Sequence, residues 1–175
     1  MKQTKEPSSF TFLHNDLNTS SAALLEGAEE IAVDTEAMGL IHGRDRLCLV
    51  QICDEKDNVI CVKIELGQTS APRLQAIMEN KAIQKVFHYA RFDIAALAYG
   101  LDIKVEPIFC TKVASKLGRT YTPRHGLKEL IMELEGIELD KQSQSSDWGT
   151  TKELNEKQLI YAANDVRYLL SAKSI

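Results

Sequence analysis

Two carboxylates stand close together at the point where an apolar segment ends. In the stretch IAVDTEAMGL, Asp34 and Glu36 follow the apolar residues 31–33. Side chains two residues apart on a β-strand point to the same face, so the two carboxylates lie side by side if the strand reaches Glu36. Like charges this close repel each other unless a cation lies between them. The pair therefore indicates either a site for a divalent cation or the solvated end of a strand.

Further acidic residues occur in two segments with helical periodicity. Tyr161 and Asp165 in YAANDV are four residues apart, which places a phenol and a carboxylate on one helical face. Asp93 in FHYARFD falls in the first turn of another predicted helix, at the edge of its apolar side. Each of these acids alone fits a helix cap or a solvated side chain. Metal binding becomes the better explanation only if the fold brings them to Asp34 and Glu36.

The composition is that of an ordinary globular protein. Its 175 residues are 44% hydrophobic and 26% charged, which favours a single domain with one sizeable core. No apolar run approaches the roughly 18 residues of a membrane span, and MKQTKEPSSF lacks the apolar centre of a secretory signal. We therefore expect a soluble, cytoplasmic protein with no membrane partner. The net charge of −4 excludes a protein that coats long nucleic acid by charge alone, but leaves room for a local basic groove.

The cysteines lie within apolar runs and lack the close paired spacing of a zinc site or a redox motif. Cys48, Cys53, Cys61 and Cys110 are therefore predicted to be buried thiols in a reducing compartment. A metal site built from cysteine is not expected.

The order of the predicted elements indicates how the acidic residues are positioned. The β-rich runs are residues 9–14, 31–34, 47–53 and 58–64, with a short run at 85–88. The predicted helices are residues 20–30, 72–80, 91–100, 110–118, 125–136 and a last helix from 155 to 172. The first of them closes either at Gly27 or at the acidic pair 29–30. The three central runs suggest an antiparallel meander. Strands first and helices on both sides later predict an α/β fold with a mixed sheet flanked by helices.

The last helix is preceded by the polar segment 140–155, the longest connection of low hydrophobicity. A loop of this length in a compact domain is more often functional or packed near a site than idle. Asn155 and Gln158 at its end match a capping box, which marks where the last helix begins.

Taken in order, the Asp-x-Glu pair, the later helical Asp and the final Tyr-x-x-x-Asp resemble the three motifs of the DEDDy 3′-5′ exonucleases. The resemblance extends from about Ile31 to Leu170, and SSDWG and TYTPRHGLK add to it. Within that family the chain is most similar to nano-RNase C, a bacterial relative of RNase D without the additional C-terminal helical domains. GLIHGRDRLCLVQI, FHYARFD and KQSQSSDWG carry this closer likeness.

The resemblance implies a ribonuclease H-like fold and a single exonuclease domain over residues 1–175. It implies that two divalent cations, Mg²⁺ or Mn²⁺, are bound by Asp34, Glu36, Asp93 and Asp165, at the spacing of about 3.5–4 Å typical of two-metal sites. Tyr161 would orient the attacking water or help to deprotonate it. Orientation is the favoured role unless the metals lower the pKa of the hydroxyl, because a phenol with a pKa of about 10 is a poor base at neutral pH.

The closer likeness also implies a substrate and an assembly. Nano-RNase C-like enzymes cleave short single-stranded RNA, down to dinucleotides, and form ring-like homo-oligomers. The sequence ends at Ile175, whereas such chains usually continue, which leaves the oligomer and the substrate length open. The same motifs also fit RNase D-like trimming of structured RNA 3′ ends, or a DNA exonuclease. An inactive nucleic-acid-binding scaffold is a weaker alternative, because all four carboxylates and the tyrosine are present.

Four further residues bear on substrate binding, each with a structural alternative. Leu40 matches the apolar wedge that separates terminal bases in the family, or is a core leucine. His88 and His125 bind a phosphate or sugar hydroxyl, or serve as caps. Trp148 stacks on a base, or packs the long loop.

A basic surface would complement a phosphodiester substrate. Without the four carboxylates of the motifs the formal charge of the chain is zero, so much of its acidity belongs to the predicted site. The candidate outer contacts to phosphate are Arg119, Arg124, Lys112 and Lys116. Each is equally well explained as a solvated surface charge.

Overall fold

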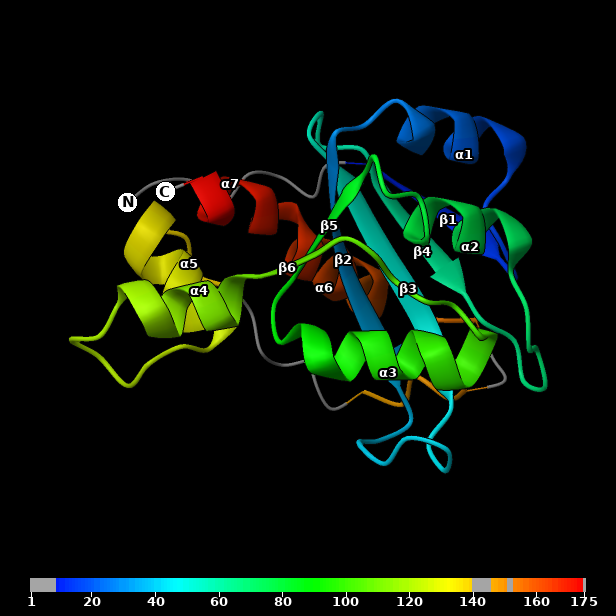
Figure 1. The fold of residues 1–175 in the computed structure, drawn as a ribbon. Helices are drawn as coiled ribbons and strands as arrows, with labels where there is room; N and C mark the ends of the chain where they lie inside the picture. Colours follow the sequence, from blue (N-terminus) through cyan, green and yellow to red (C-terminus); the bar gives the residue numbers. More distant parts are fainter. Residues whose placement is uncertain (1–8, 140–145, 151–152, 175) are drawn as a thin grey trace.

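The protein folds around a mixed β-sheet. The computed structural model describes residues 9–139, 146–150 and 153–174, and within them the sheet has six strands in the order β1-β4-β3-β2-β5-β6 (Figure 1). The strands are β1 (Phe10–His14), β2 (Glu30–Ala37), β3 (Leu47–Asp54), β4 (Val59–Lys63), β5 (Gln84–Phe87) and β6 (Ile108–Cys110). β2, β3 and β4 form an antiparallel meander, and the pairs β1–β4, β2–β5 and β5–β6 are parallel. The predicted mixed α/β sheet is thereby confirmed.

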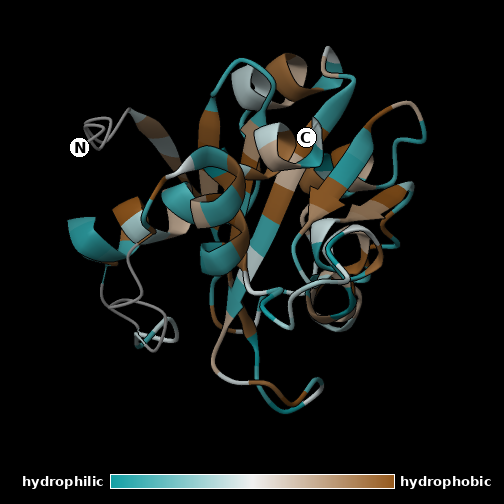
Figure 2. Cartoon of the chain, turned by 90° about the vertical axis from the view of Figure 1, so that its left-hand side faces the viewer, coloured by the Kyte–Doolittle hydropathy of each residue, from teal (hydrophilic) through white to brown (hydrophobic). Residues whose placement is uncertain are grey.

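Helices cover both faces of the sheet. They are α1 (Thr19–Glu26), α2 (Pro72–Met78), α3 (Ala90–Leu101), α4 (Thr111–Gly118), α5 (Leu127–Glu135), α6 (Glu156–Arg167) and α7 (Leu169–Ser174). In Figure 1, α3 crosses in front of the sheet and α6 lies behind it, while α4 and α5 gather beyond the β6 edge. Helix α7 packs against β2 and β5. Figure 2 shows largely hydrophobic strands and mostly hydrophilic connections, as expected for a sheet covered on both sides.

The two sides of β2 belong to two different apolar clusters. Ile31 and Val33 pack with α1, α2 and α3, whereas Ala32 packs with α6. This alternation follows from the two-residue period of a strand. Asp34 continues the series of Ala32, and Thr35 continues the series of Ile31 and Val33. The carboxylates of β2 therefore face α6, while Thr35 faces α3.

Several boundaries differ from the sequence prediction. The first helix begins at Thr19 and closes at Gly27, the earlier of its two predicted ends, so residues 28–30 are not helical and Glu30 already belongs to β2. The predicted helix 110–118 begins at Thr111, because Cys110 ends the unpredicted strand β6. The last helix breaks at Tyr168 into α6 and α7.

The predicted helix ends on either side of the long loop are confirmed. Gly136 closes α5 in the left-handed conformation that glycine adopts without strain, at φ 70°. Asn155 and Gln158 form the capping box at the start of α6. Of the polar loop between them, residues 140–145 and 151–152 lie outside the described part of the chain.

The cysteine prediction is confirmed in part. Cys48, Cys53 and Cys61 are buried free thiols, whereas Cys110 is only half-buried. Burial raises the pKa of the Cys53 and Cys61 thiols to about 12, so both stay protonated at neutral pH. Among the described residues, no helix has the length and apolar character needed to span a membrane.

Candidate active site

The site is built on the C-terminal half of β2. The strand continues to Ala37, so Asp34 and Glu36 lie in extended backbone and point to the same side, as the sequence predicted. Both side chains are half-buried. The ladder to β3 shifts register between Glu36 and Ala37, where the strand leaves the sheet and the following loop begins.

Helix α6 brings the second part of the site to the first. Its apolar stripe packs on the sheet, with buried residues Leu159, Ala162, Ala163 and Val166. Tyr161 and Asp165 flank this stripe, and the Tyr161 hydroxyl donates a hydrogen bond to the Asp165 carboxylate. The predicted pairing of phenol and carboxylate on one helical face is therefore present.

Three carboxylates from these two elements converge. Asp34, Glu36 and Asp165 each place one carboxylate oxygen so that the three atoms lie within 4.8 Å of one another. Burial raises the pKa of Asp34 to about 7. Burial and the neighbouring carboxylates raise the pKa of Glu36 to about 10, and the pKa of Asp165 is raised for the same two reasons. The raised pKa values mean that negative charge is unfavourable in this cluster unless it is neutralised by a proton or by a bound cation.

Asp93 approaches from the other side of β2. It lies in the first turn of α3, is 2% exposed, and accepts hydrogen bonds at Oδ1 from the Thr35 amide (3.0 Å) and the Thr35 hydroxyl (2.7 Å). Burial and the Asp34 charge raise its pKa. Asp93 is thus adjacent to the cluster but outside the group of three close oxygens. Thr35, which the sequence analysis missed, connects it to β2.

A cavity of about 660 Å³ opens over Asp34, Glu36, Tyr161 and Asp165. Leu40 lies on its wall and is 80% exposed, so it is not a core leucine. Trp148 also lines the cavity, but it is buried with its ring centroid 6.2 Å from that of Tyr161. In the structure, Trp148 therefore packs the long loop against α6.

His88 lines the same cavity as a neutral hydrogen-bonding group. Its Nδ1 lies 2.9 Å from the Thr111 hydroxyl, which itself donates to the Phe87 carbonyl. The Thr111 oxygen must therefore accept from Nδ1, and this fixes the tautomer. Burial lowers the pKa of His88 to about 4, so the ring carries no charge near pH 7.

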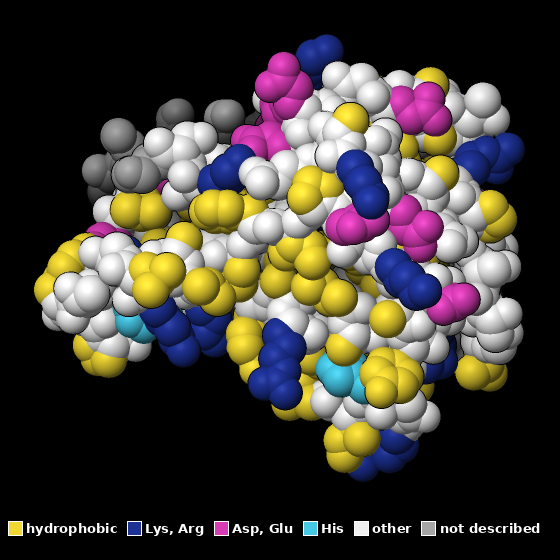
Figure 3. Space-filling model, in the orientation of Figure 1, with side chains coloured by type: hydrophobic (Ala, Val, Ile, Leu, Met, Phe, Trp, Pro, Cys, Tyr) yellow, Lys and Arg dark blue, Asp and Glu magenta, His cyan; other side chains and the backbone are white. Residues whose placement is uncertain are grey.

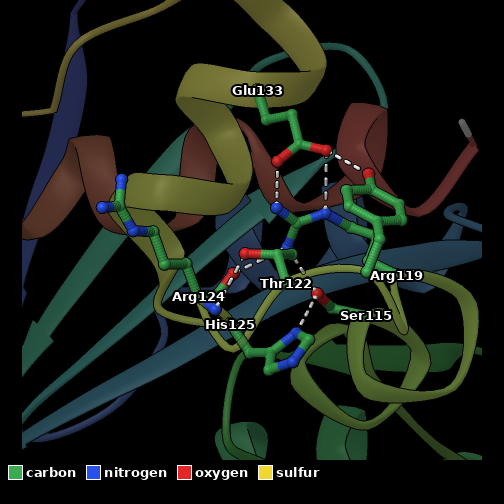
Figure 4. Close-up of polar contacts among 7 residues, drawn as sticks. Ser115, Arg119, Thr122, Arg124, His125 and Glu133 are labelled. Carbon is green, nitrogen blue, oxygen red and sulfur yellow. Dashed lines mark hydrogen bonds and ion pairs between the residues drawn. The ribbon is translucent and has the colours of Figure 1, made fainter.

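The loop between α4 and α5 contains the other predicted contacts and is held internally (Figure 4). Arg119 is buried, and its guanidinium donates to Glu133, the Ser115 hydroxyl and the Arg124 carbonyl. Arg119 is therefore an internally bonded structural group and not the solvated surface charge that was the predicted alternative. The Nδ1 atom of His125 lies at hydrogen-bond distance, 2.9 Å, from the Ser115 hydroxyl oxygen. Among the described residues that line the cavity, neither His125 nor Arg124 occurs.

Two lysines supply positive charge at the cavity. Lys112, which the sequence analysis proposed, and Lys128, which it missed, both line the cavity, whereas Lys116 does not belong to the described lining. Lys112 Nζ lies 4.4 Å from the centroid of the Tyr89 ring. Figure 3 shows Lys and Arg side chains between the α4 end of the molecule and the nearby end of α3. Lys128 is the last residue of TYTPRHGLK, and its place in that stretch was the signal that could have identified it.

Comparisons with known proteins agree with this geometry. A sequence profile described as a 3′-5′ exonuclease matches residues 11–174. Ribonuclease D of Bartonella henselae is 31% identical over 147 residues, which cover 84% of this chain and 36% of the relative. The chain thus spans little more than a third of that protein.

Solved structures extend the similarity to the fold. NrnC of Brucella melitensis matches with a TM-score of 0.89 and 44% identity, covering 95% of this chain and 79% of that one. Two other structures of the Brucella protein contain Mg²⁺ or pGG. RNase D of Escherichia coli, described as an exoribonuclease involved in structured RNA processing, matches with a TM-score of 0.78 and 26% identity, covering 95% and 44% of the two chains.

Proposed function

The chain belongs to the 3′-5′ exonuclease family, and from this premise we propose that it hydrolyses short oligoribonucleotides, down to dinucleotides, to nucleoside 5′-monophosphates. The observation that carries the proposal is the convergence of Asp34, Glu36 and Asp165 at a cavity with the exposed Leu40 on its wall. An inactive scaffold would have no need to hold repelling carboxylates together. The similarity to NrnC, whose structure with pGG is known, favours a short substrate.

The donor set fits divalent cations. Carboxylate oxygens are the ligands that Mg²⁺ and Mn²⁺ prefer, and three lie within 4.8 Å of one another. Asp34, Glu36 and Asp165, together with Asp93, would hold two such ions. When bound, the ions would activate water as the nucleophile and stabilise the departing 3′ oxygen. The Thr35 hydrogen bonds keep the Asp93 carboxylate turned toward β2.

Tyr161 would orient the attacking water. Burial and the nearby carboxylates raise the pKa of its hydroxyl above the ordinary value of 10, so the phenol remains protonated at neutral pH. It therefore acts by hydrogen bonding and not as a base. Its bond to Asp165 and its packing beside Trp148 hold the hydroxyl in one place.

Other residues of the cavity would bind the substrate. The exposed Leu40 suits the wedge that contacts terminal bases, and Lys112 and Lys128 suit phosphate groups. The neutral His88 suits a ribose hydroxyl. His125 and Arg124 remain predicted contacts that only a longer substrate would reach.

The test compares two substrates side by side. Initial rates are measured on a 5′-labelled diribonucleotide and on a longer single-stranded RNA, with Mg²⁺, with Mn²⁺ and with chelator. We expect rapid, metal-dependent cleavage of the diribonucleotide. Stepwise shortening of the long RNA that spares the diribonucleotide would instead identify RNase D-like trimming, and preference for a matched deoxyribonucleotide would identify a DNA exonuclease. Cleavage of none of these in either metal would overturn the enzymatic proposal.

We also propose that residues 1–175 form a single exonuclease domain and that it assembles into a homo-oligomer. The family profile extends over residues 11–174, and both large apolar clusters share one sheet. Val113 and Leu117 expose apolar side chains on α4, Leu117 with 76% of its surface, which suits a subunit contact. Light scattering would measure the mass, and a monomer at all concentrations would contradict the assembly. The cytoplasmic location stays a prediction.

A further inference from the structure

One polar side chain lies in the middle of an otherwise apolar strand segment. Gln51 is the fifth residue of LCLVQIC on β3 and is 0% exposed. Its neighbours two positions away along the same face are Leu49 and Cys53, both in the apolar cluster beneath α6. Burial of a carboxamide costs free energy unless its hydrogen bonds are made, and a leucine would fill this position without that cost. The residue therefore calls for a specific explanation.

The contacts of Gln51 supply one. In the antiparallel ladder Gln51 is the direct partner of Asp34, so both side chains lie on the α6 face. Its Nε2 donates a hydrogen bond of 3.3 Å to Asp34 Oδ2, and the same side chain lies near enough to Glu36 to oppose the rise of that carboxyl's pKa. A single carboxamide thus acts on two of the three carboxylates that converge at the site.

When a cation is bound the carboxylates are ionised and only accept hydrogen bonds, so the contact with Asp34 selects the NH₂ group of the amide. The other end of the side chain, Oε1, is buried and has no hydrogen-bond partner among the described residues. The carboxamide is therefore placed for its donors alone. A neutral donor also suits this position, because a lysine or arginine would bring a positive charge that competes with a cation.

We propose that Gln51 is a positioning residue that holds the Asp34 and Glu36 carboxylates in the orientation needed to bind divalent cations. This inference rests on the proposed function, since it concerns the same carboxylates. Outer partners of metal ligands typically change metal affinity or activity by about 10- to 100-fold when removed. The side chain touches neither the substrate nor the reacting atoms, so its effect is transmitted through the two carboxylates.

The experiment titrates Mn²⁺ alone into the wild-type protein, Gln51→Met and the control Leu49→Met by calorimetry. Gln51→Met keeps an unbranched side chain in the apolar layer but removes both donors, and Leu49→Met alters packing two residues away on the same face. We expect Gln51→Met to weaken Mn²⁺ binding at least about 10-fold, with Leu49→Met close to wild type. The melting temperature in chelator should stay within a few degrees for both variants, which separates positioning from loss of fold.

A spectroscopic measurement gives a second readout. In the wild-type protein, Mg²⁺ should shift the side-chain NH₂ resonances of Gln51, identified by their absence in Gln51→Met. The NH₂ of Gln75, which donates to Glu79 on α2, should not move. Wild-type Mn²⁺ affinity in Gln51→Met, or unchanged Gln51 resonances, would overturn the inference. A third outcome separates the two proposals: the wild-type protein binds Mn²⁺, Gln51→Met binds it more weakly, and the wild-type protein cleaves no RNA. That outcome would uphold the inference and overturn the proposed function.

Discussion

At the scale of single residues, the site is a balance between repulsion and a bound cation. Burial raises the pKa of Asp34, Glu36 and Asp165, and the charge of Asp34 adds to the rise for Glu36 and Asp165, while the Thr35 amide offsets part of it for Asp34. In the metal-free protein, ionisation of all three carboxyl groups is unfavourable because they lie so close together. Under the proposed function, the same short distances allow them to bind a cation jointly. Substitutions here should therefore move activity and stability in opposite directions.

Asp34→Asn is the direct test of that balance. Loss of this ligand should lower the rate on a diribonucleotide by more than about 100-fold, beyond the range of outer-sphere partners. In chelator the variant should melt at a higher temperature than wild type, because one of the repelling acids is gone. Asp102→Asn, at the far end of α3, is the matched control and should change neither quantity. A variant with wild-type activity would remove Asp34 from the catalytic set.

Tyr161→Phe separates the phenol from the metal ligands. Only the hydroxyl that donates to Asp165 is removed, so Mn²⁺ affinity measured by calorimetry should stay within about 3-fold of wild type. The kcat should fall by about 100-fold, the lower end of the range for a positioned proton-handling group. Tyr99→Phe, whose ring stacks on His42 away from the cavity, is the control. A parallel loss of metal affinity would assign Tyr161 a ligand-supporting role instead.

At the scale of elements, α6 must dock in register for the site to exist. Its capping box fixes the first turn, and Asp165 lies ten residues beyond Asn155. Asn155→Ala should destabilise the fold by about 1 kcal/mol in urea unfolding and also weaken Mn²⁺ binding. Asn18→Ala removes the corresponding cap of α1, which bears no site residue, and should cost similar stability with no change in binding. Equal effects on binding would indicate a global cause.

The elements also show what a sequence can predict here. The meander was predictable because β3 and β4 are continuous apolar runs, and α6 because its cap and stripe are local features. Strand β6 was not, because three residues carry too little periodicity and its pairing with β5 involves a distant segment. The contact of Gln51 with Asp34 likewise depends on strand register. The residue types along β2 were enough to predict the carboxylate pair. That Asp93 lies on the opposite face of β2 from the other three acids could be seen only in the folded sheet.

At the scale of the whole molecule, the site joins both layers of helices through one strand. On one face of β2, Thr35 donates hydrogen bonds to Asp93 of α3. On the other face, Asp34 and Glu36 are directed toward α6. The four carboxylates of the motifs meet only when both helices are packed on β2. Folding therefore creates the acidic cluster, and the free energy of its ionisation becomes part of the stability of the molecule.

That coupling predicts how stability depends on pH. Unfolded carboxylates titrate near pH 4, whereas folding raises the pKa of Asp34 to about 7 and that of Glu36 to about 10. Between pH 6.5 and 7.5 the folded state therefore binds more protons than the unfolded state, and the free energy of unfolding must fall as the pH rises. Folding also lowers the pKa of His88 from 6.5 to about 4 and that of Lys85 to about 8, so these two groups bind fewer protons in the folded state and oppose the trend. The carboxylates with raised pKa values outweigh them, because Glu36 alone keeps a proton throughout this window.

Melting temperatures across this window, in chelator and in Mg²⁺, would measure the effect. In chelator the melting temperature should decrease from pH 6.5 to 7.5, and Asp34→Asn should flatten the decrease because it removes the group that titrates there. In Mg²⁺ the trend should reverse, since the ions bind the ionised carboxylates and ligand binding stabilises the folded state. A melting temperature in chelator that rises over the same interval would mean that the acids are already ionised without metal. In that case a positively charged or hydrogen-bonding group of the protein would offset the repulsion among Asp34, Glu36 and Asp165 in the absence of metal.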